Sequence, residues 1–264
     1  MSRRSIFSLT TAFVLLLAAV PTVATEAEPS ISDLGETFAA QYRDRVPTQW
    51  GEHFPGILDS LPPVQKDHDA PRTLALTLDA CEGDTDRRII ALLRKHSVPA
   101  TIFATNRWLI RNKAVAADLA ADPLFAFACH GKRHRPASVN GKRAYGIAGT
   151  RTIQALVEEA EDNARAIAAL TGKRPRWYRS GTAHYDEVAV AIIADLGLAV
   201  AGYTVSADQG ASLPARDVAR RISRAPDLAV ILLHLNHPES GTFQGLAEAI
   251  PKMIEQGVRF VKLE

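Results

Sequence analysis

The chain has 264 residues, 47% of them hydrophobic, and a formal net charge of +2 from 31 basic and 29 acidic residues. This near balance of charge gives no indication of nucleic-acid binding, and two cysteines are too few for a small fold held together by disulfides. A chain of this length and apolar content can bury one substantial core, and (β/α) barrels of this size are single domains.

The first residues have the pattern of a secretory signal peptide. Arg3 and Arg4 form a basic start, an apolar segment follows, and small residues lead to Ala24. The apolar segment is shorter than the ~18–20 residues that span a membrane. We therefore expect a signal peptide over residues 1–24, with Ala27 as the second choice of cleavage site, and no stable membrane insertion afterwards. Removing these two of the 31 basic residues leaves 29 against 29 acidic residues. The expected destination is the periplasm or the exterior.

Residues 25–70 are polar and contain several prolines, with scattered apolar residues at Trp50, Phe54, Ile57 and Leu58. We interpret this segment as an N-terminal arm that packs on the following domain without forming one of its own.

Over residues 71–264, apolar runs alternate with stretches of helical periodicity. The expected strands are Thr73–Leu78, Pro99–Ala104, Leu124–Ala128, Arg174–Tyr178, Ala199–Val205, Leu228–Leu233 and Val258–Leu263. The expected helices are Asp86–Lys95, Lys113–Ala121, Thr152–Leu170, Asp186–Leu196, Ala215–Ile222 and Phe243–Glu255. Continuous apolar strands that alternate with helices indicate a parallel sheet covered on both faces. We predict an α/β fold, a distorted seven-stranded parallel (β/α) barrel in a single domain.

Several expected strands end in residues suited to acid–base chemistry or metal binding. Asp79 ends the first strand, His130 and His134 follow the third, and His234 follows the last strand but one. Because the carboxyl ends of parallel strands share one rim of a barrel, these side chains can lie together. Acidic residues within 84–86 are nearer the next helix and better placed to cap it, which leaves Asp79 free for chemistry.

Two imidazoles four residues apart can face one side of a turn and suit a zinc ion. The simpler alternative is a solvated pair in a basic loop. Arg179 is suited to hold a carboxylate in place, although it could be a surface cation, and Asp208 could be an ordinary turn aspartate.

In their order along the chain, these motifs resemble those of the polysaccharide deacetylases, carbohydrate esterase family four, over roughly Leu74 to Leu263. The matching segments are Thr77-Leu-Asp-Ala80 for the family's TFDD, His130-Gly-Lys-Arg-His134 for HxxxH, Arg179-Ser-Gly-Thr182 for RPPY, Ala207-Asp-Gln209 for the D-W motif and Leu233-His234 for LxH.

The resemblance implies that Asp79 is the catalytic base, braced by Arg179. It implies that His130 and His134 bind a divalent metal ion, for which zinc is expected, and that the Thr182 backbone N–H binds the oxyanion. It further implies that His234 is the general acid and that Asp208 tunes it.

The main departure from the family pattern is Ala80, which stands where the family has a metal-binding aspartate. The other departures are Ser180 and Gly181 for the two prolines and Gln209 for the tryptophan. The third metal ligand therefore stays open: Asp79, an acid within Glu82–Asp86, or additional waters.

The implied activity is removal of N-acetyl, or O-acetyl, groups from an acetylated polysaccharide or oligosaccharide. A catalytically silent carbohydrate-binding protein on the same fold is the alternative, because fold alone does not give function. Retention of Asp79 and His234 argues against it, since a binding module needs no acid–base pair.

The two cysteines flank the candidate site, because Cys81 follows Asp79 and Cys129 precedes His130. In an oxidising compartment we expect a Cys81–Cys129 disulfide between the two loops. The alternatives are that Cys81 is a thiolate metal ligand, or that both are buried free thiols.

Overall fold

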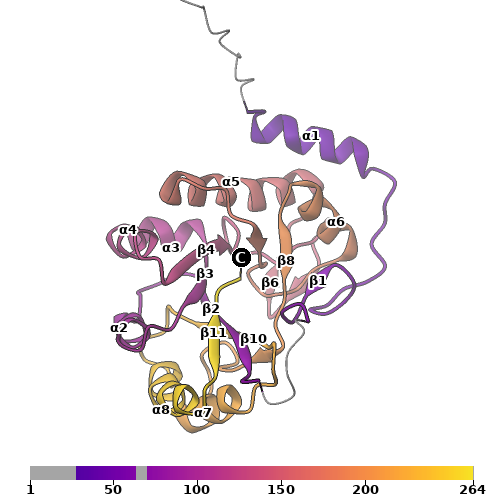
Figure 1. Ribbon diagram of the computed structural model, residues 1–264. Helices are drawn as coiled ribbons and strands as arrows, with labels where there is room; N and C mark the ends of the chain where they lie inside the picture. Colours follow the sequence, from indigo (N-terminus) through magenta and orange to yellow (C-terminus); the bar gives the residue numbers. More distant parts are fainter. Residues whose placement is uncertain (1–27, 64–69, 264) are drawn as a thin grey trace, which may run out of the picture.

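The computed structural model describes residues 28–63 and 70–263, which form one α/β unit (Figure 1). The expected signal peptide and its cleavage site lie outside these residues. Within the described part of the chain, no helix has the length and apolar character needed to cross a membrane.

The described residues form eight helices and eleven strands. The helices are α1 (Ile31–Gln41), α2 (Arg87–Lys95), α3 (Asn106–Arg111), α4 (Lys113–Ala120), α5 (Ile153–Thr171), α6 (Glu187–Asp195), α7 (Ala215–Ser223) and α8 (Thr242–Glu255). The strands are β1 (Ile57–Leu58), β2 (Thr73–Ala80), β3 (Ala100–Ala104), β4 (Phe125–Cys129), β5 (Arg143–Ala144), β6 (Ile147–Ala148), β7 (Trp177–Tyr178), β8 (Ala199–Ala201), β9 (Val205–Ser206), β10 (Val230–His234) and β11 (Arg259–Val261).

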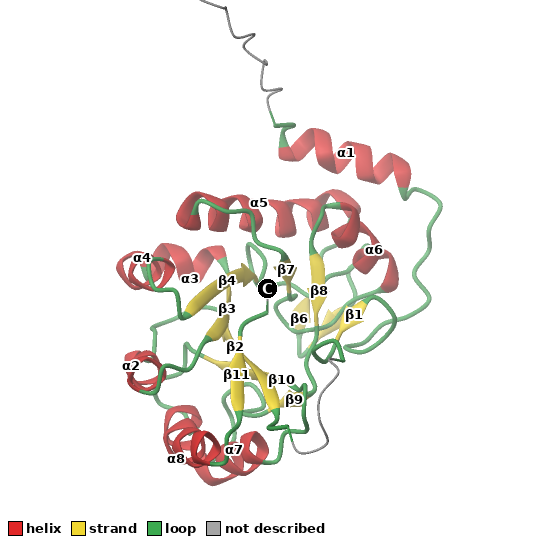
Figure 2. Ribbon diagram, in the orientation of Figure 1, coloured by secondary structure: helices red, strands yellow, loops and turns green. Residues whose placement is uncertain are grey.

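Nine strands form one sheet in the order β1-β8-β7-β4-β3-β2-β10-β9, with β11 paired to the start of β2. All pairings in this sheet are parallel. The strands curl around the centre of the molecule and the helices lie outside them (Figure 2). The predicted α/β fold with a curled, barrel-like parallel sheet is thus confirmed, and every expected strand is present in whole or in part. Among the described residues the sheet has nine strands rather than the predicted seven, and β1 and β9 lie at its two ends.

The expected strand 199–205 is interrupted, which gives β8 and β9. Arg179 explains the interruption, because its guanidinium donates to the carbonyls of Ala201 (3.3 Å) and Gly202 (2.7 Å). Backbone acceptors taken by a side chain are not available to a neighbouring strand.

The N-terminal arm adds more structure than its composition indicates. It contains α1, capped by Ser30, and this helix packs on α5. Tyr42 donates from its hydroxyl to Asp195 at 2.7 Å. Further along, β1 pairs with β8 and extends the sheet.

The alternation of side chains along β2 separates the core from the site. Leu74, Leu76, Leu78 and Ala80 are fully buried in the cluster formed with the outer helices, whereas Ala75 belongs to a smaller cluster within the curl of the sheet. Because side chains alternate between the two faces of a strand, every second residue from Ala75 onward faces the interior of the barrel.

Candidate active site and metal centre

Asp79 lies on the interior face of β2 and is 4% exposed. Its Oδ1 accepts a hydrogen bond from Arg179 at 2.7 Å, and the same guanidinium nitrogen donates to the Thr77 hydroxyl at 3.0 Å. Burial by itself would raise the pKa of Asp79, but the charge of Arg179, helped by nearby histidines, holds this pKa below its ordinary value. Asp79 is therefore an ionised carboxylate kept in place by a fully buried arginine.

His130 is positioned by the backbone at the end of β4 and by helix α5. Asn163 on α5 accepts hydrogen bonds from the backbone N–H groups of His130 and Gly131, both at 2.9 Å. The Nδ1 of His130 lies 2.9 Å from the Arg179 carbonyl. A carbonyl can only accept, so Nδ1 carries a proton, and Nε2 is the ring nitrogen that faces Cys81 and can serve as a metal ligand.

The loop that carries His134 is hydrogen-bonded to Glu159, which lies on α5 like Asn163. The buried Glu159 carboxylate accepts from the backbone N–H groups of Arg133 (2.8 Å) and Arg135 (3.1 Å). His134 itself adopts a positive φ of 61°, and a Cβ at Gly181 would clash with the His134 backbone. The loop geometry thus requires a glycine where the family has a proline.

Cys81 completes a cluster with these two histidines. Ligand atoms of Cys81, His130 and His134 all lie within 4.8 Å of one another, and no other such trio occurs in the described residues. The Cys81 Sγ is 3.5 Å from the His130 Nε2. Burial raises the pKa of Cys81, but the two histidines lower it well below its ordinary value. A thiolate with two imidazoles is a donor set that fits zinc.

The alternation of side chains along the strand explains why Cys81, and not Ala80, lies next to the two histidines. Asp79 and Cys81 are two residues apart and reach the same side, whereas Ala80 points into the outer core. The nearby acidic residues are engaged elsewhere. Glu82 pairs with Arg107, Asp84 with Arg111 and Asp86 with Arg88. The structure therefore favours Cys81 among the alternatives for the third ligand.

The predicted Cys81–Cys129 disulfide is wrong, because both cysteines are free thiols. Cys129 belongs to the core cluster under α5 and α6, while its neighbour Ala128 faces the barrel interior. Cys81 faces that interior, so the two thiols lie on opposite sides of the sheet. Burial raises the pKa of Cys129, which leaves it a protonated core residue.

His234 ends β10, beside Asp79 in the register of the sheet. Its Nδ1 is 2.9 Å from Asp208 Oδ1, and its backbone N–H donates to Asp208 Oδ2 at 2.7 Å. Thr242 also donates to Asp208, at 3.0 Å. Burial lowers the pKa of His234, but Asp208 raises it well above its ordinary value. This shift favours the charged form of His234, in which Nε2 also carries a proton.

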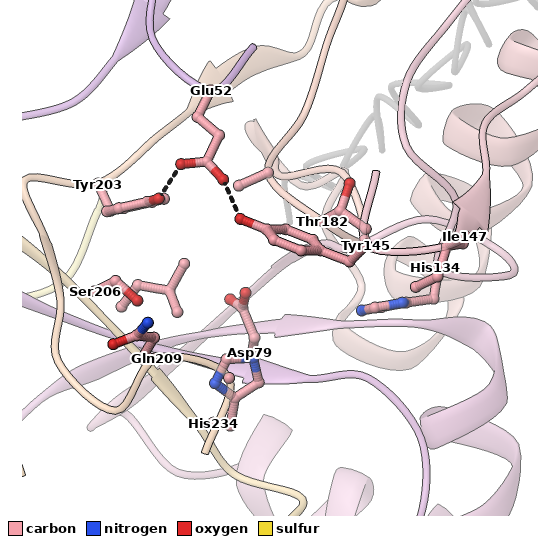
Figure 3. A pocket seen from close by; sticks show the side chains of 14 residues that line it. Glu52, Asp79, His134, Tyr145, Ile147, Thr182, Tyr203, Ser206, Gln209 and His234 are labelled. Atoms are coloured by element: carbon pink, nitrogen blue, oxygen red, sulfur yellow. Dashed lines mark hydrogen bonds between the residues drawn. The ribbon is translucent and has the colours of Figure 1, made fainter. Parts of the chain in front are cut away.

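A pocket of about 310 Å³ brings these groups together and is also lined by a residue of the arm. Figure 3 shows Glu52 across the pocket from Asp79 and His234. Thr182 lines the same pocket, and its buried hydroxyl has no hydrogen-bond partner among the described residues. Four of the seven predicted site residues line this pocket, namely Asp79, His134, Thr182 and His234. His130, Arg179 and Asp208 contact these residues from behind the lining. Sequence reasoning missed Glu52 and the two supporting residues on α5.

A carboxylate and a histidine thus lie side by side next to a donor set that can hold a metal ion, and these are groups that metal-dependent hydrolysis uses. The sequence matches the family model "Polysaccharide deacetylase" over residues 66–201, about half of the chain. The protein therefore belongs to the polysaccharide deacetylase family. No curated protein matches it in sequence.

Solved structures agree with this assignment. A mutant of BA3943, a CE4 family pseudoenzyme with restored enzymatic activity, is 25% identical, with a TM-score of 0.60 over 74% of this chain and 67% of that one; its wild type is from Bacillus anthracis. The Bc1960 peptidoglycan N-acetylglucosamine deacetylase is 18% identical, with a TM-score of 0.64 over 79% and 91%. A family 4 acetyl xylan esterase from Clostridium thermocellum, in complex with a cobalt ion, is 21% identical, with a TM-score of 0.58 over 72% and 88%.

Proposed function

We propose that this protein is an exported, metal-dependent deacetylase that removes N-acetyl, or O-acetyl, groups from a polysaccharide or oligosaccharide. The observation that carries the proposal is the presence in one pocket of Asp79, held by Arg179, and His234, held by Asp208, beside a potential metal site. The lowered pKa of Asp79 favours the carboxylate that a base needs to be, and the raised pKa of His234 favours the imidazolium that an acid needs to be.

Cys81, His130 and His134 would hold the metal ion, and their thiolate and imidazole donors favour zinc. A divalent ion in this place supplies Lewis-acid polarisation of a carbonyl and activation of a water molecule. Three protein ligands leave coordination positions open for substrate, as in catalytic rather than structural zinc sites.

The remaining steps fall to the protein. Asp79, with its lowered pKa, would accept the proton of the attacking water. The Thr182 backbone N–H would donate to the oxyanion of the tetrahedral intermediate. His234 would give its proton to the departing amine or alkoxide as the carbon–nitrogen or carbon–oxygen bond breaks.

Acetate release from a panel of acetylated glycans tests the proposal. We expect activity that disappears on chelation and returns with zinc, and a loss of about 10²–10⁴-fold in kcat for Asp79→Asn or His234→Ala. Asp118→Asn, at a helix surface position paired with Arg94, is the matched control and should retain full activity.

The similarity to a pseudoenzyme is the reason to keep the alternative of a silent carbohydrate-binding protein. Glycan binding by the zinc-loaded protein, with no acetate release from any member of the panel, would refute the deacetylase and establish this alternative.

A further inference from the structure

The part of the arm that carries Glu52 is fixed to the barrel on both sides of this residue. Gly51 exchanges two backbone hydrogen bonds with Tyr185, at 3.1 and 2.9 Å. Upstream, the backbone N–H groups of Thr48 and Gln49 donate to Glu187, and downstream β1 joins the sheet. The position of Glu52 over the pocket is therefore a property of the fold.

The carboxylate of Glu52 accepts hydrogen bonds from two tyrosines of other segments and lies close to a histidine whose Nδ1 is bonded to the Thr182 carbonyl at 2.9 Å. Tyr145, at the tip of the β5–β6 hairpin, donates to Oε1 at 2.8 Å, and Tyr203 donates to Oε2. His184 Nδ1 lies 3.3 Å from Oε1. Figure 3 shows the carboxylate between the two tyrosines, facing the pocket. A carboxylate offers about four acceptor positions, so lone pairs remain for a ligand.

The aromatic rings of Tyr145 and Trp50, beside Glu52, are of the kind on which sugars stack. Tyr145 is 77% exposed as a residue, although its hydroxyl is engaged, and its ring packs edge-on to His184. Trp50 lies against the same histidine. Aromatic residues with an apolar face and a polar edge suit sugars, whose C–H faces pack on rings while their hydroxyls need acceptors.

The charge of the pocket limits which sugars fit. Glu52 and Asp79 are both acidic, and no lysine or arginine is among the described residues that line the pocket. Arg179 is fully buried and already paired with Asp79. A carboxylate on the sugar unit next to Glu52 would therefore meet a like charge and no pocket-lining lysine or arginine among the described residues, whereas His234 lies across the pocket.

We propose that Glu52, Tyr145 and Tyr203 form a specificity subsite that binds the hydroxyls of an uncharged sugar unit and rejects units that carry a carboxylate. This inference rests on the proposed function, since it assigns the sugar class to the same pocket. Glu52 is a positioning residue for the glycan and takes no part in the chemical step.

Calorimetric titration with two probes tests the subsite. The probes are tetra-N-acetylchitotetraose and the same tetramer with its C6 hydroxyls oxidised to carboxylates, and an Asp79→Asn background keeps both intact. We expect the uncharged tetramer to bind about tenfold more tightly than the oxidised one. Glu52→Gln keeps the shape and removes the charge, so the ratio should fall below about threefold. Glu36→Gln, an exposed change on α1, is the matched control and should keep the full ratio.

Two results would overturn the subsite: an unchanged ratio in Glu52→Gln, or failure of the uncharged tetramer to bind at all. The outcome is separable from the proposed activity. Discrimination lost in Glu52→Gln, combined with no acetate release by the protein with Asp79 intact, would uphold the subsite and refute the deacetylase. Acetate release, combined with an unchanged affinity ratio in Glu52→Gln, would uphold the deacetylase and refute the subsite.

Discussion

Replacing Cys81 with serine should weaken metal binding strongly while leaving the fold intact. Zinc sites with four protein ligands bind with about 10–16 kcal/mol, which is about 2.5–4 kcal/mol for each ligand. At about 1.4 kcal/mol per tenfold change, loss of the thiolate corresponds to roughly a 10²–10³-fold lower affinity. Cys81→Asp places a carboxylate on the same interior face of the chain and should recover most of this loss.

Competition with a chromophoric chelator measures the affinity for zinc. Cobalt substitution gives a second readout, because a thiolate ligand produces a sulfur-to-metal charge-transfer band in the near ultraviolet. We expect this band in the wild-type protein and its absence in both Cys81 variants. Cys129→Ala is the matched control, since Cys129 is buried on the opposite side of the sheet, and it should keep both the affinity and the band.

Cys81→Ser with wild-type zinc affinity, or a cobalt protein without the band, would refute the reasoning. The metal would then be held by the two histidines with another donor.

Three further predictions concern the groups around the metal site. Asp208→Asn removes the carboxylate that raises the pKa of His234; because a general acid must be protonated, the alkaline limb of the kcat/KM profile should move to lower pH, and an unmoved limb would contradict the assigned role. Arg179→Ala leaves the buried base without its cation and should lower the free energy of unfolding in urea by about 3–5 kcal/mol; a change below about 1 kcal/mol would show that the ion pair contributes little. Asn163→Ala removes an acceptor from the metal-binding loop and should weaken zinc binding about 10–100-fold, whereas Asn140→Ala, in an exposed loop, should not.

Much of the barrel could be predicted because its strands are continuous apolar runs with buried positions on both faces. The helix α1 was missed, although Ser30 followed by Ile31, Leu34 and Phe38 gives a capping residue and helical spacing. The break between β8 and β9 could not be predicted, because it depends on where the Arg179 guanidinium lies in three dimensions.

The site was predictable where its residues end strands, and less so where they do not. Asp79 and His234 lie side by side in adjacent strands, as their positions at strand ends indicate. The alternation that places Cys81 on the interior face was present in the sequence as well. The role of Glu52 could not be predicted from the residues around it in the sequence, because Glu52 reaches the pocket through the pairing of Gly51 with Tyr185.

Similarity to a pseudoenzyme shows that the fold alone does not decide between catalysis and binding. The energetics of the buried charges bear on this question more directly. Asp79, Arg179 and Asp208 are all less than 5% exposed, and removing an ion from water carries a penalty of several kcal/mol that pairing only partly offsets. Binding of a sugar does not require these ion pairs, and apolar residues of similar volume would stabilise the barrel at least as well. An acid and a base each held by its own buried partner are the features that deacetylation needs.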